Sequence, residues 1–291
     1  MRGHPFWFVV AFTLGAVAVA STPSGPGAPL LAASRSALGV DVDVYTGPVA
    51  RDVWRRMKRA DVEVVVAQTW GGRSRNEFAA SQLAGARRAG LKTAAYVLLN
   101  YDNRVCPTHA SPVRDAYGRC MGEPVEQDEP GGRWQVQQGL AALEREFATV
   151  AFVAIDVEWF LQADPASDGQ AQALRRQSIV DAVNEVRRRG KAPVIYTRNA
   201  RRHWTDITGC HAEAAVDECA DGPHDRDHPL ATVPLWDVER GEPELDGFEP
   251  YGHWTSRAGR QYQLDVHRFG LPKRRTVDLN VFDPALFTNA R

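Results

Sequence analysis

The sequence has little excess charge of either sign, and it lacks the common signals for nucleotide chemistry. Its 291 residues contain 35 Lys and Arg against 36 Asp and Glu, which gives a formal net charge of −1. A dedicated nucleic-acid binder usually carries a basic excess, so this balance predicts no nucleic-acid partner. No G-x-G-x-x-G or P-loop follows a strand pattern, which argues against a nucleotide-binding fold. We expect no cofactor and no bound metal.

Cysteine is scarce. Its four copies are Cys106, Cys120, Cys210 and Cys219, and none of them forms a C-x-x-C pair, so redox and zinc-site interpretations are weak. Four cysteines permit three pairings. We expect the local pairing, Cys106–Cys120 with Cys210–Cys219, because each bond would fix one long polar loop.

Long apolar runs are missing after the first 20 residues. Before that point, residues 6–20 form an apolar run, with Arg2 ahead of it and an Ala-Val-Ala cleavage pattern at its end. These proportions are typical of a secretory signal peptide over residues 1–20, with an uncleaved anchor as the alternative. Residues 21–35 are rich in Pro, Gly, Ser and Ala and are interpreted as a linker. We therefore expect a secreted protein, extracellular or periplasmic, with no membrane association after cleavage and one domain over residues 36–291.

Strand and helix patterns alternate along most of this domain, and then the helices stop. Eight short runs rich in β-branched and aromatic residues predict strands, at residues 38–45, 62–70, 92–101, 151–160, 193–198, 233–239, 260–266 and 276–282. Helical patterns separate or follow the first five, at residues 48–60, 74–89, 133–148, 170–189 and 199–208. The alternation predicts parallel strands with right-handed crossovers. The predicted fold is an α/β, irregular TIM-type (β/α)5(β)3 barrel, with an open doubly wound sheet as the alternative.

Carboxylates mark the ends of three predicted strands. Asp156 and Glu158 are two residues apart, so they share one face of their strand, opposite an apolar face. Asp41 lies on the first strand, and Asp278 and Asn280 lie in register on the last, which neighbours the first in a closed barrel. Catalytic residues of such barrels come from the carboxyl ends of strands. We therefore expect one acidic rim.

Paired carboxylates are the groups that glycoside hydrolysis requires, one to protonate the leaving oxygen and one to act at the anomeric side. Crowding raises the pKa of one member and keeps it protonated. Aromatic side chains near strand ends would offer apolar faces to sugar rings, although core packing is the alternative for each. The candidates for substrate binding are Trp70, Tyr96, Tyr196, Trp236 and Asn280.

Six motifs, in chain order, resemble glycoside hydrolase family 25, the lysozymes with N-acetylmuramidase activity. They are Gly39-Val40-Asp41-Val42, Ala95-Tyr96, Asp156-Val157-Glu158, Ile195-Tyr196-Thr197, Gln261-Tyr262 and Val277-Asp278-Leu279-Asn280-Val281-Phe282. The resemblance implies a barrel of five β/α units followed by three strands. It makes Glu158 the general acid, and Asp156 the group that stabilises positive charge or orients the substrate's N-acetyl group. Asp41 and Asp278 would complete an acidic floor.

The implied reaction cleaves the β-1,4 bond between N-acetylmuramic acid and N-acetylglucosamine in peptidoglycan or a related polysaccharide, with the protein acting as a monomer. The chain departs from the family pattern after Asp41-Val42, at Arg260, and in two insertions over residues 102–132 and 210–228. We expect the first insertion to wall one side of the cleft. Two alternatives stay open: a non-catalytic wall-binding protein on the same barrel, and a metal-dependent phosphoesterase.

Overall fold

A computed structural model of the chain describes residues 36–101, 131–158, 169–200, 203–209, 230 and 232–288, and the backbone of two short segments, 104–105 and 123–124. These residues belong to one compact unit, Arg35–Arg291. The predicted signal peptide, the predicted linker and all four cysteines lie outside the described residues.

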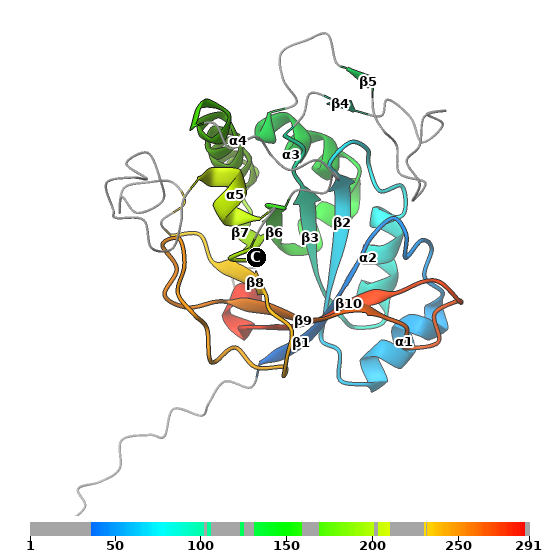
Figure 1. The fold of residues 1–291 in the computed structure, drawn as a ribbon. Helices are drawn as coiled ribbons and strands as arrows, with labels where there is room; N and C mark the ends of the chain where they lie inside the picture. Colours follow the sequence, from blue (N-terminus) through cyan, green and yellow to red (C-terminus); the bar gives the residue numbers. More distant parts are fainter. Residues whose placement is uncertain are drawn as a thin grey trace, which may run out of the picture. The chain divides into compact units, whose positions relative to one another are not determined.

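Eight strands close into a barrel (Figure 1). They are β1 (Ala37–Val42), β2 (Val64–Gly71), β3 (Lys92–Leu98), β6 (Val150–Asp156), β7 (Ala192–Thr197), β8 (Leu235–Val238), β9 (Gly259–Val266) and β10 (Val277–Phe282). Their order around the barrel is β1-β10-β9-β8-β7-β6-β3-β2, while β4 (Arg104–Val105) and β5 (Glu123–Pro124) form a separate two-stranded sheet. The eight predicted strands and the closed barrel are confirmed.

Helices follow the first five barrel strands. They are α1 (Arg51–Arg59), α2 (Ala79–Arg88), α3 (Gly132–Ala141) with the 3-10 helix η1 (Glu144–Thr149), α4 (Gly169–Arg188) and α5 (Trp204–Thr208). The connections after β8 and β9, at residues 239–258 and 267–276, are described throughout and contain no helix. The second of these is too short for a crossover, and β10 accordingly runs antiparallel to both β9 and β1. A last 3-10 helix, η2 (Pro284–Phe287), follows β10.

Three predicted helices, α1, α2 and α5, begin later than their sequence patterns suggest, and α5 starts at Trp204 and not at residue 199. Local hydrogen bonds account for the first two. The chain forms a turn after β1, in which the Thr46 N–H donates to Asp43 Oδ1 at 2.8 Å, so α1 starts at Arg51 and not at Pro48. Before α2, the Asn76 side chain donates to the Gln68 carbonyl at 2.9 Å and holds residues 72–78 against β2. Side chains that bond to backbone groups compete with helix formation, which explains both shortened starts.

The barrel wall separates two apolar cores. The outer core lies between the strands and the helices, and its fully buried members include Trp54, Leu83 and Ile179. The inner core fills the barrel, where Phe282 sits so close to Gly39 and Gly259 that a Cβ on either would lie 2.6 or 2.8 Å from its ring. This packing occupies the end of the barrel where β1 begins. Inward polar side chains lie towards the opposite end.

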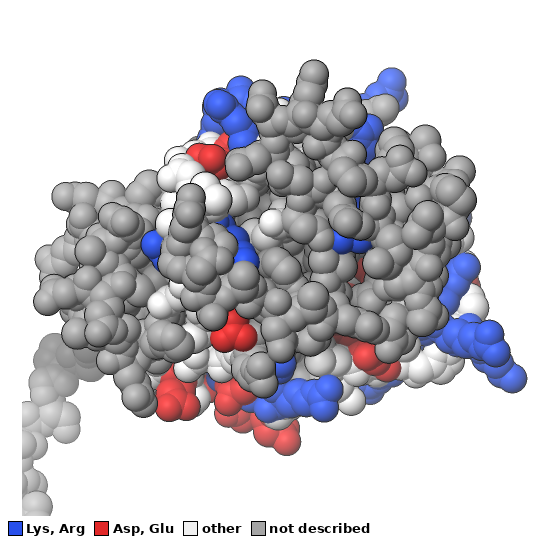
Figure 2. All heavy atoms as spheres, turned by 45° about the horizontal axis from the view of Figure 1, so that its top comes forward, with Lys and Arg blue, Asp and Glu red and all other residues white. Residues whose placement is uncertain are grey.

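Both Lys and Arg side chains and Asp and Glu side chains are visible on the described part of the surface (Figure 2). The connection after β8 is acidic and exposed at Glu239, Glu242, Glu244, Asp246 and Glu249. None of the helices in the described part of the chain is long and apolar enough to cross a membrane.

Candidate active site

The four carboxylates expected at one rim meet at the carboxyl end of the parallel strands. Asp41 of β1 pairs in register with Asp278 of β10. Asp156 is the last residue of β6, and Glu158 follows two residues later. Between them, Val157 packs into the outer core, which leaves both carboxylates on the inner side of the wall. The carboxylates are close enough to interact electrostatically: burial raises the pKa of Asp156, and the charges of Glu158 and Asp41 raise it further.

Amide side chains hold the Asp41 and Asp278 pair. Gln261 Nε2 donates to Asp41 Oδ2 at 2.9 Å and to Asp278 Oδ2 at 3.3 Å. Asn280 Nδ2 donates to the same Asp41 oxygen at 2.8 Å. The Asp265 N–H donates to the other oxygen of Asp278 at 2.6 Å. Two neighbouring acids thus share one amide donor, which keeps them close in spite of their like charge.

Two aromatic side chains fix which way these amides point. The indole N–H of Trp236 donates to Asn280 Oδ1 at 3.0 Å, and an indole nitrogen can only donate. Asn280 must therefore turn its NH2 group to Asp41. In the same way, the Tyr196 hydroxyl donates to Gln261 Oε1 at 2.7 Å, which leaves the Gln261 NH2 group for the two carboxylates. A buried layer of polar side chains thus orients the acidic floor.

Burial raises the pKa of three of these carboxyl groups, those of Asp41, Asp156 and Asp278. The pKa of Asp41 rises to about 6, because burial outweighs the hydrogen bonds from Asn280 and Gln261. The pKa of Asp278 rises to about 8, through burial and the nearby Asp41. That of Asp156 rises well above its ordinary value. A proton held by Asp278 at neutral pH reduces the repulsion that the clustered carboxylates would otherwise produce.

Asp156 and Glu158 differ in their access to solvent. Asp156 is 4% exposed, and its Oδ1 atom has no hydrogen-bond partner among the described residues. The Glu158 side chain is 34% exposed, and its Oε2 atom lies 3.4 Å from His203 Nε2. One carboxyl group is therefore buried with a free acceptor position, and the other is open to an incoming molecule. The two carboxyl groups therefore lie in different environments, which is a condition for dividing two roles between them.

Two residues around this pair, His203 and Arg175, were not predicted from the sequence. His203 precedes α5, six residues after the end of β7, in a segment whose pattern predicted a weak helix. Arg175 is buried on α4, and it lowers the pKa of Tyr101, which burial and Asp156 raise. These side chains come from helices and loops, so strand alternation gave no signal for them. A histidine soon after a predicted strand was the one available hint.

The predicted substrate-binding residues take up different positions. Tyr96 is half-buried and faces the acids, which contribute with burial to its raised pKa, and its hydroxyl accepts from Gln68 at 3.2 Å. Tyr196, Trp236 and Asn280 are buried beneath the acids as the orienting layer described above. Trp70 departs most from expectation. A register shift in β2 turns it to the outer core, where its N–H donates to Gln135 of α3 at 3.1 Å.

The raised pKa of Asp278 predicts that the free energy of unfolding depends on pH through this residue. An acid whose pKa is higher in the folded state than in the unfolded state stabilises the fold below its ordinary pKa, near 4, and that contribution is lost as the pH rises through about 8. Asp278→Asn keeps the acceptor oxygen but cannot ionise. We expect it to raise Tm at pH 8 by at least about 2 °C relative to wild type. Its effect at pH 4.5 should be smaller, and an equal effect at the two pH values would contradict this origin.

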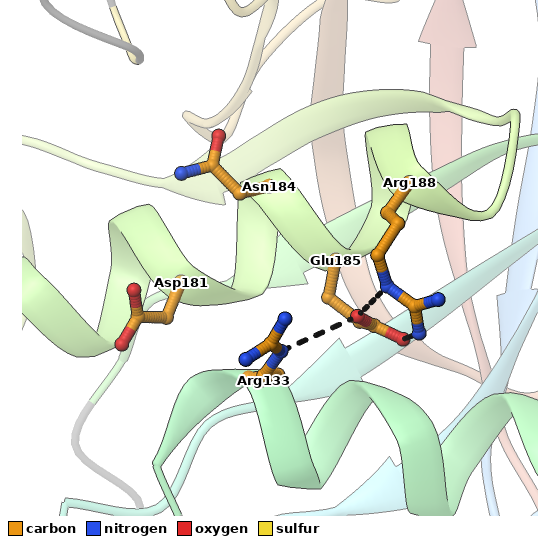
Figure 3. A pocket seen from close by; sticks show the side chains of 5 residues that line it. All are labelled: Arg133, Asp181, Asn184, Glu185 and Arg188. Atoms are coloured by element: carbon orange, nitrogen blue, oxygen red, sulfur yellow. Dashed lines mark hydrogen bonds and ion pairs between the residues drawn. The ribbon is translucent and has the colours of Figure 1, made fainter.

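A surface pocket of about 240 Å³ lies elsewhere, between α3 and α4, and is lined by Arg133, Asp181, Asn184, Glu185 and Arg188 (Figure 3). The fully buried Glu185 carboxylate accepts from Arg188 at 2.6 Å and from Arg189 at 2.9 Å. Burial favours a higher pKa for Glu185, but these arginines outweigh it and lower the pKa to about 2. Arg133 of α3 lies 3.7 Å from the same carboxylate, so this ion-pair cluster joins the two helices.

No group of three or more His, Cys, Asp or Glu side chains in the described part of the chain is placed to hold a metal ion. The residues from His224 to His228, which look metal-like in sequence, lie outside the described residues, as does most of the insertion over residues 102–132.

Comparison with known proteins gives matches in structure but not in sequence. No protein-family model matches the chain, and no curated protein sequence matches it. Among solved structures, the bacterial lysozyme from Streptomyces coelicolor is 17% identical, with 89% of this chain and 100% of that one covered at a TM-score of 0.57. A family 25 glycosyl hydrolase from Bacillus anthracis is 14% identical, with 84% and 88% covered at 0.53.

A third match is the modular autolysin LytC from Streptococcus pneumoniae, in complex with a synthetic peptidoglycan ligand. It is 12% identical, with 85% of this chain and 46% of that one covered, at a TM-score of 0.53. Identities this low establish the fold alone. The chain therefore has the barrel fold of the family 25 glycoside hydrolases, with four carboxylates at the carboxyl end of its parallel strands.

Proposed function

We propose that this protein is a glycoside hydrolase of the lysozyme type, which cleaves the β-1,4 bond between N-acetylmuramic acid and N-acetylglucosamine in peptidoglycan. One observation carries the proposal: an accessible carboxyl group, Glu158, stands beside a buried one, Asp156, at the mouth of a barrel with the fold of lysozymes. The pneumococcal autolysin with the same type of fold, solved with a peptidoglycan ligand, supports the choice of substrate.

The proposed roles follow from burial and hydrogen bonding. Glu158 donates a proton to the leaving glycosidic oxygen, because its side chain is 34% exposed whereas Asp41 and Asp156 are buried. Asp156 faces the developing positive charge or orients the N-acetyl group, through the oxygen that has no protein partner among the described residues. Asp41 and Asp278 complete the floor, and Tyr96 offers its half-buried ring to a sugar. Carboxylates that differ in environment are what glycoside hydrolysis uses.

The direct test is to digest purified peptidoglycan and identify the new reducing ends after borohydride reduction. We expect reduced muramic acid and no gain in reduced glucosamine. New reducing ends on glucosamine would show cleavage of the other glycosidic bond. Binding to the glycan with no new reducing ends of either kind would instead show a non-catalytic wall-binding protein.

We also propose that the protein is exported and cross-linked. The support is sequence alone: the apolar run and cleavage pattern within residues 1–20, and two pairs of cysteines close in sequence. Mass spectrometry of protein from a secreting host should find a mature chain that begins at Ser21. Non-reduced digests should contain peptides that link Cys106 to Cys120 and Cys210 to Cys219. Free thiols at all four positions, or crosswise links, would contradict this proposal.

A further inference from the structure

Two segments that lie side by side concentrate the positive charge of the chain. They are α1 and the connection between β9 and β10, residues 267–276, and together they are called the basic surface below. They contain nine of the 35 Lys and Arg residues but only one of the 36 Asp and Glu residues. The rest of the chain is left with 26 basic and 35 acidic residues. The near-zero net charge thus conceals a strong separation of charge.

Hydrogen bonds fasten the two segments into one surface. Arg56 Nε of α1 donates to the Phe269 carbonyl at 2.5 Å, and Arg275 donates to the Pro48 carbonyl at 2.7 Å. Next to them, the Thr46 hydroxyl donates to the Thr276 carbonyl at 3.1 Å. These bonds use Arg56 and Arg275 internally, and they hold side by side the two segments that carry the remaining basic residues.

Seven of the basic side chains are exposed, and none makes an ion pair with another residue in the described part of the chain. They are Arg51, Arg55, Lys58, Arg59, Arg268, Lys273 and Arg274. Outside the basic surface, Arg87 and Arg257 do form ion pairs, with Glu146 and Asp237. Figure 2 shows Lys and Arg side chains along its right-hand edge, the side on which Figure 1 places α1 and the turn into β10. Charge of one sign without internal neutralisation predicts a partner of the opposite sign.

The basic surface begins at the rim of the candidate active site. β10 runs antiparallel to β1 with Asp278 opposite Asp41, so the residues that precede β10 lie just beyond the acidic floor. The turn after β1 lies at the same rim and leads into α1. A long polymer bound across the floor therefore has a path onto the basic surface. A short glycan confined to the floor would not reach the far end of α1.

We propose that the basic surface binds a linear anionic polymer with phosphodiester repeats, carried by the same walls as the glycan. This inference rests on the proposed function, because it assumes that a wall polymer enters the barrel mouth. Arg51, Arg55 and Arg59 recur every four residues, about 6 Å along the helix, which makes a row suited to repeated anions. Five of the seven exposed cations are arginine, the side chain that best matches phosphate oxygens.

The test measures co-sedimentation of the protein with insoluble bacterial walls, before and after hydrofluoric acid has removed their phosphodiester polymers. Glu158→Gln is used as the background, so that the walls are not digested. The test variant adds Arg51→Gln, Arg55→Gln and Arg59→Gln. The matched control adds Arg88→Gln, Arg145→Gln and Arg240→Gln, three exposed arginines outside the basic surface. Each protein is measured over a range of NaCl concentrations.

We expect the test variant to bind untreated walls about tenfold more weakly than its parent at low salt, with a salt dependence reduced by roughly two in its log–log slope. The control triple should bind like the parent, and hydrofluoric acid treatment should abolish the difference. Equal binding of all three proteins, or a difference that survives the treatment, would overturn the proposal. So would tighter binding to single-stranded DNA than to polymer extracted from the walls.

The binding assay does not depend on hydrolysis. The same substitutions in a background with Glu158 intact should leave cleavage of short, soluble glycan fragments unchanged. If wild type cleaves no glycan but binds walls as expected, the proposed function fails and the polymer site stands. If wild type cleaves glycan while the basic-surface substitutions leave wall binding unchanged, the proposed function stands and the polymer site fails.

Discussion

Glu158→Gln is expected to lower the turnover of peptidoglycan by about 10²–10⁴, the usual contribution of a general acid. Glutamine has the same shape but cannot donate the proton that the leaving oxygen needs. The Glu158 side chain is 34% exposed, so its carboxyl group can reach a bound glycan. The measurement is kcat from reducing-end release, alongside the affinity for walls.

The loss should appear in kcat, and binding should survive, because the amide keeps most of the polar contacts of the carboxyl group. Glu63→Gln is the matched control, since Glu63 precedes β2 at the opposite end of the barrel. It should behave as wild type. Turnover within a few-fold of wild type in Glu158→Gln would exclude the proposed proton donor.

The fold could be predicted from the sequence because each barrel strand has one face that packs on helices. Val153, Ile155 and Val157 show this for β6, with the inner residues alternating between them. The pattern located all eight strands. Helix starts were less certain, because local bonds decide them, such as that from the Asn76 side chain to the Gln68 carbonyl. Such bonds depend on how the turn approaches the strand, which alternation does not show.

The positions of the acids could also be predicted from the sequence, since strand alternation and barrel closure placed Asp41 opposite Asp278. The roles of the aromatic residues could not be predicted in this way. Trp236 and Tyr196 looked like sugar-binding rings, yet they are buried donors that orient Asn280 and Gln261. Trp70 faces outward because β2 shifts register after Gln68, which a regular alternation does not anticipate. Contacts between strands distant in sequence decide these roles.

Asp156→Asn should lower kcat by about 10²–10³, the usual loss when one electrostatic contact to a transition state is removed. Asp156 is buried, and its Oδ1 atom, which has no hydrogen-bond partner among the described residues, is the one we propose to face the substrate. Asparagine cannot supply negative charge there. The fold should nevertheless gain stability near neutral pH. Burial first, and then Glu158 and Asp41, raise the pKa of Asp156, so its ionisation costs the folded state free energy that an amide does not require.

Asp237→Asn should show the opposite pattern. Asp237 is a buried carboxylate on β8, but it takes part in an outer network, where it accepts from the Tyr251 hydroxyl at 2.8 Å and from Arg257 at 3.2 Å. Burial raises the pKa of Asp237 too, but loss of its charge also leaves a fully buried guanidinium with a weaker partner, which costs about 1–3 kcal/mol. We expect a lower Tm with an unchanged kcat per folded molecule. Measured together, Asp156→Asn should be more stable and much slower, and Asp237→Asn less stable and equally fast. If both variants lost activity only in proportion to lost folded protein, Asp156 would have no role beyond structure.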